Sequence, residues 1–186
     1  QYPEDDSIQE AFEEDFDFSE TKDQLKTINT IKNDMMKGTI VDRLVCGDVG
    51  YGKTEVAMRA ALKTVLGGYQ VAYLAPTTIL SRQHYHTFKN RFERFGVNVG
   101  LLNRFVSQKD QRSLLKDVKS GESDIVIGTH RLLSDDIAFN KLGLLIVDEE
   151  QRFGVIHKEK IKQLKKSINV ITLTATPIPR TLQMAI

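Results

Sequence analysis

Eight residues from Gly47 to Thr54 combine glycines, a lysine and a threonine at a spacing suited to binding phosphate. They read Gly47, Asp48, Val49, Gly50, Tyr51, Gly52, Lys53 and Thr54, which is glycine, any four residues, then Gly-Lys-Thr. In this P-loop pattern the glycines let backbone N–H groups turn toward phosphates, Lys53 supplies a positive charge, and the Thr54 hydroxyl is a Mg²⁺ ligand. A glycine-rich turn that only joins a strand to a helix would not require the Lys-Thr pair. We therefore expect this stretch to bind ATP and Mg²⁺.

A second polar cluster, Asp148 to Gln151, directly follows the apolar run Leu142–Val147. Ionised carboxylates at the end of a buried strand need cations nearby, so we expect them to face Mg²⁺ rather than form a solvated acidic turn. Asp148 is the predicted outer ligand of the Mg²⁺ that Thr54 holds, and Glu149 is predicted to orient and deprotonate an attacking water. The adjacent second carboxylate favours a hydrolase, although neither cluster alone excludes a small-molecule kinase.

A third cluster, Thr174-Ala175-Thr176, follows the apolar run Asn169–Leu173 and precedes Pro177. Taken alone it is a weak signal, because small hydroxyl residues at a strand end commonly cap the next helix.

These clusters must be positioned by alternating strands and helices. The predicted strands are Arg43–Cys46, Tyr69–Ala75, Asn98–Leu102, Asp124–Gly128, Leu142–Val147 and Asn169–Leu173. The predicted helices are Glu55–Leu66, residues 79–94, residues 107–120, and one that begins near Thr21, where Thr21 and Gln24 have capping-box spacing. This alternation predicts an α/β fold with a doubly wound, mainly parallel sheet, helices on both faces, and ligands at the carboxyl ends of the strands. The single cysteine, Cys46, is expected to be an inert thiol in a buried strand.

Composition and charge indicate the general class of protein. The 186 residues are 40% hydrophobic and 27% charged, which is typical of one globular domain. No apolar run is long enough to span a membrane and the N-terminus is acidic rather than basic, so a cytoplasmic protein is expected. Residues 1–23 carry ten acidic side chains and one lysine, whereas the rest carries 25 basic and 15 acidic ones. The basic body suits a polyanionic partner such as nucleic acid, or it reflects lysines scattered over solvated helix faces.

Residues 1–18 are predicted to form an acidic linker helix, separate from a domain at 19–186. The prediction depends on Ile8, Phe12 and Phe16, which are four residues apart as on one face of a helix. The alternative is a disordered acidic tail.

The three clusters together resemble the superfamily 2 helicases and translocases, in order and in approximate spacing. Longer blocks are similar to the bacterial transcription-repair coupling factors: Gly47–Glu55, Ala75–Leu80, Gly128–Leu133, Asp148–Gly154 and Leu173–Thr181. The related RecG helicases share most blocks but typically have Asp-Glu-Gln-His where this chain has Asp148-Glu149-Glu150-Gln151. The resemblance implies a RecA-like P-loop ATPase lobe.

The resemblance also implies roles for individual residues. Gln24 would lie near the adenine, which competes with its reading as a capping side chain. Gln151, Thr174, Ala175 and Thr176 would couple ATP hydrolysis to movement between lobes. Candidate contacts to the backbone of double-stranded DNA are Thr77, Arg104, Thr129, His130 and Arg131, with surface or packing roles as the alternative for His130 and Arg131. His84, His86 and His157 lack metal-ligand spacing and are interpreted as surface or satisfied histidines.

The family's motor has two lobes, so the resemblance implies that a second lobe, absent from this chain, supplies an arginine finger. The isolated lobe should then be nearly inactive. The expected function is an ATP-dependent double-stranded DNA translocase that displaces stalled RNA polymerase at DNA lesions and couples transcription to nucleotide excision repair. RNA polymerase and excision-repair proteins would bind other parts of the protein. The alternatives are a RecG-like helicase that remodels replication forks, and a P-loop kinase or nucleotide-gated binding module.

Overall fold

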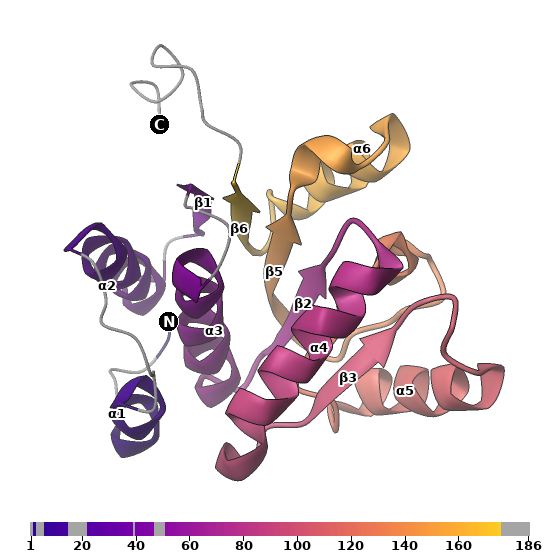
Figure 1. Cartoon of the computed structure of the whole chain (residues 1–186), viewed down its shortest axis with the longest axis horizontal. Helices are drawn as coiled ribbons and strands as arrows, with labels where there is room; N and C mark the ends of the chain where they lie inside the picture. The colour runs from indigo at the N-terminus through magenta and orange to yellow at the C-terminus, as the bar shows by residue number, and fades with distance from the viewer. Residues whose placement is uncertain (1, 3–5, 15–21, 39, 47–50, 176–186) are drawn as a thin grey trace.

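The computed structural model describes residues 2, 6–14, 22–38, 40–46 and 51–175 (Figure 1). At its centre is a sheet of six parallel strands in the order β1-β6-β5-β2-β4-β3. The strands are β1 (Asp42–Cys46), β2 (Gln70–Leu74), β3 (Val99–Leu102), β4 (Ile125–Gly128), β5 (Leu142–Asp148) and β6 (Asn169–Thr174). The predicted doubly wound parallel sheet is confirmed, and each predicted strand matches within one residue at either end.

Helices cover both faces of the sheet (Figure 1). They are α1 (Ser7–Glu14), α2 (Lys22–Met36), α3 (Tyr51–Leu66), α4 (Thr78–Phe92), α5 (Gln108–Ser120) and α6 (Val155–Leu164), with short 3-10 turns η1 (Glu93–Phe95), η2 (His130–Leu133) and η3 (Glu150–Arg152). Apolar side chains of α1 to α4 pack in one core cluster with one face of the sheet, and those of α5 and α6 pack on the other.

The central strands are buried on both faces, as expected of a covered parallel sheet. In β2, Val71 and Tyr73 face the cluster beneath α3 and α4, whereas Ala72 and Leu74 face the cluster beneath α5 and α6. This double burial explains why β2 and β5 read as nearly continuous apolar runs. It also fixes the register, because a slip of one residue would exchange the two faces.

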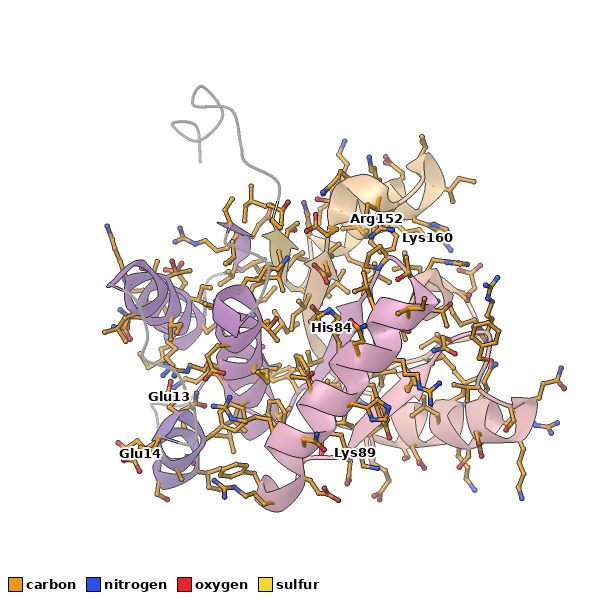
Figure 2. The ribbon with its side chains drawn as sticks, viewed as in Figure 1. Glu13, Glu14, His84, Lys89, Arg152 and Lys160 are labelled. Atoms are coloured by element: carbon orange, nitrogen blue, oxygen red, sulfur yellow. The ribbon has the colours of Figure 1, made fainter. Side chains whose placement is uncertain are left out.

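Helix α1 is docked on the lobe (Figure 2). Phe12 is fully buried, with its ring centroid 4.6 Å from that of Phe92 and 5.4 Å from that of Phe95. The Arg91 guanidinium lies 4.2 Å from the Phe12 ring centroid and donates a hydrogen bond of 2.6 Å to the Phe12 carbonyl. The predicted helix within residues 1–18 is therefore present over Ser7–Glu14. Of its predicted apolar stripe, Phe12 belongs to the core of the lobe, Ile8 is 40% exposed, and Phe16 lies outside the described residues.

A buried group of charged side chains lies beneath α1. Glu55 is 2% exposed and accepts hydrogen bonds from Arg59 Nε at 2.8 Å and from Arg91 Nη1 at 2.6 Å. Glu13, on the side of α1 that faces α2 and α3, pairs with Lys32 and lies 3.8 Å from Arg59 Nε (Figure 2). Buried charges persist only when they are paired, so this network joins α1, α2, α3 and α4 by specific contacts.

Three features differ from the sequence prediction. Helix α3 begins at Tyr51 rather than at the predicted Glu55. The expectation of a buried Cys46 is wrong: its side chain is exposed, because β1 is an edge strand with β6 as its single neighbour and only Val45 in it is buried. The sequence also gave no prediction for α6, in which Ile161 is the one fully buried position, whereas Val155 and Ile156 are exposed. None of the described helices combines the length and the apolar composition needed to cross a membrane.

Candidate nucleotide-binding site

The predicted site residues that the structure describes gather at the carboxyl ends of β5 and β6 and at the start of α3. Strand β6 lies between β1 and β5, so its last residue, Thr174, comes close to the end of β5. Helix α3 begins at Tyr51 and carries Lys53 in its first turn. Gly47, Asp48, Val49, Gly50 and Thr176 lie outside the described residues, and so do the side chains of Tyr51 and Gln24. This edge of the sheet is where a doubly wound fold binds its ligands.

Lys53 points toward two carboxylates. Its Nζ lies 3.4 Å from Glu149 Oε1 and 3.7 Å from Asp148 Oδ1. All three side chains are largely withdrawn from water, with exposed fractions of 10% for Lys53, 5% for Asp148 and 15% for Glu149. One cation thus balances two anions in a poorly solvated place, which leaves the group able to take up a further cation.

Asp148 uses its two oxygens differently. Its Oδ2 lies 3.0 Å from His84 Nε2 and 3.4 Å from the Tyr73 hydroxyl, which donates to it. Its Oδ1 is buried and has no hydrogen-bond partner among the described residues. A buried carboxylate oxygen without a donor is costly, and a divalent cation would satisfy it. The residues therefore fit a Mg²⁺ ion, with Thr54, half-buried beside Lys53, as a second candidate ligand.

The environment of Tyr73 keeps its hydroxyl a donor. The side chain is fully buried, and burial together with the charge of Asp148 raises the pKa of Tyr73 well above its usual value of 10.0. The phenol therefore stays protonated at neutral pH and can hold Asp148 Oδ2 without competing for its charge.

Glu149 is fixed by the backbone and by its neighbours. It is the one described non-glycine residue with a positive φ (52°), and its N–H donates to the Leu173 carbonyl at 2.8 Å. Its Oε1 accepts from the Ala175 N–H at 2.9 Å, and its Oε2 accepts from the Thr174 hydroxyl at 3.3 Å and from the Gln151 amide. A residue held in a sparsely populated backbone region by such contacts is typical of functional sites.

These contacts also set the charge of Glu149. Burial alone would raise its pKa, but the hydrogen bonds from Ala175 and Gln151 and the charge of Lys53 together lower the pKa below its usual value of 4.5. Glu149 is therefore ionised at neutral pH and can accept a proton. Besides Lys53, its donors are Gln151, Thr174 and Ala175, which come from the segments predicted to couple hydrolysis to movement.

The candidate DNA contacts lie on the other half of the same sheet edge, after β2, β3 and β4. Arg104 is exposed, with its guanidinium 4.9 Å from the Phe105 ring centroid, and His130 is exposed and stacks on His157 with a centroid distance of 4.9 Å. Three others have partners within the chain. Arg131 makes two hydrogen bonds to Asp136 at 2.6 and 2.7 Å, Thr77 caps α4 by accepting from the Leu80 N–H, and Thr129 is buried. As the structure stands, Arg104 and His130 are the more accessible of the five.

Sequence reasoning did not find the roles of His84 and Tyr73. The sequence analysis interpreted His84 either as a surface histidine or as one with its hydrogen bonds satisfied. The structure shows the second, because His84 bonds to Asp148. A signal exists in retrospect: His84, Phe88 and Phe92 are four residues apart, so all three lie on the face of α4 that packs on the sheet.

Comparison with known proteins identifies the family and agrees with the fold. Residues 21–185 match the family model for DEAD/DEAH box helicases. The chain is 59% identical over 181 residues to the transcription-repair-coupling factor of Bacillus subtilis (strain 168), covering 97% of this chain and 15% of that protein. It is 52% identical over 185 residues to that of Borreliella burgdorferi, covering 100% of this chain and 16% of that protein. The chain therefore spans about 15% of the length of these relatives.

A solved structure of RecG bound to a three-way DNA junction superposes with a TM-score of 0.85 at 34% sequence identity. The match covers 99% of this chain and 25% of that chain. The resemblance indicated by the sequence blocks, to the transcription-repair coupling factors and more distantly to RecG, is thus confirmed. Because the family model matches residues 21–185, nearly the whole sequence, and the fold agrees with a solved helicase structure, this chain belongs to the DEAD/DEAH box helicase family.

Proposed function

We propose that this chain is the ATP-binding lobe of an ATP-dependent DNA translocase and acts as part of a longer protein. The observation that carries the proposal is the convergence of Lys53, Asp148 and Glu149, with the buried Asp148 Oδ1 lacking a hydrogen-bond partner among the described residues. Membership of the DEAD/DEAH box helicase family supports it.

Each residue of the site has a part in ATP hydrolysis. Lys53 and the backbone of residues 47–52 bind the phosphates, and Thr54 and Asp148 would hold Mg²⁺, which when bound would neutralise developing phosphate charge. Glu149 orients the attacking water and accepts its proton. Gln151, Thr174, Ala175 and Thr176 hold Glu149 in place and relay the state of the site, while Gln24 contacts the adenine.

The DNA contacts form a second part of the proposal. Arg104, His130, Arg131, Thr77 and Thr129 follow strands on the half of the sheet away from Lys53. Cations and hydroxyls at such loops bind the phosphate backbone and position a duplex without reading its sequence. Arg131 would exchange Asp136 for a DNA phosphate, which retains a charge-assisted, bidentate geometry.

We further propose that the whole protein, in the cytoplasm, displaces RNA polymerase stalled at DNA lesions and brings in excision-repair proteins through segments outside this chain. The support is the identity of 52–59% to proteins named transcription-repair-coupling factor.

The test uses the full-length protein, ATP, and RNA polymerase stalled on DNA by withholding a nucleotide. The expected result is ATP-dependent release of the polymerase by the parent protein and none by the Glu149→Gln variant, since the amide keeps the shape of the side chain and loses the base. Polymerase that stays bound with the parent protein and ATP would contradict the proposal.

A second candidate is a helicase that remodels branched DNA, and the observation that favours it is the structural match to RecG on a three-way junction. The same preparation decides between the two. Unwinding of a three-way junction without release of stalled polymerase would favour the second candidate.

A further inference from the structure

His84 is a titratable side chain in direct contact with Asp148 that the proposed function does not use. It comes from α4, on the far side of β2 from Lys53, and reaches the end of β5 (Figure 2). Its Nε2 lies 3.0 Å from Asp148 Oδ2. A carboxylate offers only acceptors, so Nε2 carries the hydrogen and His84 donates this bond.

Packing against neighbouring side chains fixes the position of the His84 ring. Its ring lies against Tyr73 with a centroid distance of 4.7 Å and an interplanar angle of 37°. Tyr73 in turn meets Phe88 edge-on at 5.3 Å, one helical turn along α4. The ring of His84 is therefore held between α4 and β2, and its side chain is 17% exposed.

The consequence lies in the rotation of the Asp148 carboxylate. Two donors, His84 Nε2 and the Tyr73 hydroxyl, occupy Oδ2 from the α4 side. The carboxylate plane is thereby fixed so that Oδ1 faces Lys53, buried and without a hydrogen bond of its own in the described part of the chain. Without the His84 bond, the longer bond from the Tyr73 hydroxyl, at 3.4 Å, would be left to hold Oδ2, and the carboxylate could rotate more freely.

We propose that His84 is a positioning residue for the metal site: it anchors Asp148 Oδ2 so that Oδ1 is presented to a divalent cation bound with nucleotide. This inference rests on the proposed ATP-binding function. Residues that orient a metal ligand typically change metal affinity about 10–100-fold when they are replaced.

The experiment measures Mn²⁺ binding to the full-length protein by electron paramagnetic resonance, with a non-hydrolysable ATP analogue present. His84→Phe keeps a ring against Tyr73 and removes the donor, so Mn²⁺ affinity should fall about tenfold or more. His84→Gln places an amide N–H the same number of bonds from Cα as Nε2 and should restore most of the affinity. His86→Phe, on the exposed side of the same helix, is the matched control and should bind Mn²⁺ like the parent.

A second measurement distinguishes a loss of the metal site from general damage to the structure: the affinity of the ATP analogue in the presence of a chelator. It should change much less than the Mn²⁺ affinity in His84→Phe, because Lys53 keeps its charge and its shorter contact, to Glu149 Oε1 at 3.4 Å, does not involve His84. If His84→Phe fails to fold, His84→Asn replaces it, since its amide is too short to reach Asp148. Parental Mn²⁺ affinity in the donor-less variant, or equal losses with and without metal, would overturn the inference. Absence of Mn²⁺ and nucleotide binding in the parent would instead contradict the proposed function.

Discussion

Replacing Phe12 by alanine tests whether α1 is part of the lobe rather than a linker. Phe12 is fully buried, its ring is 4.6 Å from Phe92 and 5.4 Å from Phe95 by centroid, and the Arg91 guanidinium lies 4.2 Å from its centroid. Truncation of a fully buried phenylalanine costs about 3–5 kcal/mol. Loss of the cation–π contact adds about 0.5–2 kcal/mol, because the site is largely desolvated.

The full cost appears only while α1 stays docked. If α1 detaches, the loss is limited to the free energy of docking, so we expect a fall in the free energy of unfolding of about 3 kcal/mol, the lower end of the range. Ile8→Ala on the same helix is the control, because Ile8 is 40% exposed and should change stability by less than about 1 kcal/mol.

The assay is urea unfolding of the 186-residue chain followed by circular dichroism, with amide hydrogen exchange of α1 as a local readout. Phe12→Ala should also abolish exchange protection in Ser7–Glu14. A Phe12→Ala protein as stable as Ile8→Ala, with α1 still protected, would refute the docking of α1 through Phe12.

Three further predictions concern single side chains. Lys53→Ala should weaken binding of a fluorescent ATP analogue about tenfold or more, since a charge-assisted contact is worth about 1.5–3 kcal/mol; parental affinity would remove Lys53 from the phosphate site. Glu55→Gln removes the anion that pairs with buried Arg59 and partly buried Arg91, so it should lower the free energy of unfolding by about 3 kcal/mol in the same urea assay. A change below about 1 kcal/mol would contradict this prediction. The third prediction concerns pH. Burial lowers the pKa of His157 below its usual value of 6.5, and the nearby charges of His130 and Lys160 lower it further. As the pH drops through 6.5, His157 therefore takes up a proton in the unfolded chain before it does so in the folded one, and the free energy of unfolding falls. His157→Gln should make the free energy of unfolding, measured in urea on either side of pH 6.5, depend less on pH. A variant with the same pH dependence as the parent would contradict the lowered pKa of His157.

The site was predictable from sequence where its chemistry is local. The glycines before Lys53 and the carboxylates at the end of β5 can be recognised from a few consecutive residues. Because the carboxyl ends of parallel strands share one edge of the sheet, their proximity could also be predicted. The strands were equally accessible, because burial on both faces produces unbroken apolar runs. The strand order was not, since β1 pairs with β6 across most of the chain and no local pattern encodes that pairing.

The parts that sequence did not reveal depend on packing. Charged residues ordinarily lie on the surface, yet Glu55 and Arg59 are buried and Arg91 is partly buried, because both arginines pair with Glu55. The burial predicted for Cys46 was wrong, because β1 lies at the edge of the sheet and apolar neighbours in the sequence do not ensure that an edge strand is buried. His84 acquires its role only because its ring packs on Tyr73 of β2, which places it beside Asp148, 64 positions away in the chain.

The central claim is that Lys53, Asp148 and Glu149 form an ATP-hydrolysing site, and Glu149→Gln in the full-length protein tests it most directly. The measurement pairs the dissociation constant of a fluorescent ATP analogue with the DNA-stimulated rate of phosphate release. The amide oxygen can still accept from the Ala175 N–H, and the amide loses the base, so the dissociation constant should stay close to that of the parent protein while kcat falls by about 10²–10⁴. A variant that releases phosphate at the parental rate would contradict the account.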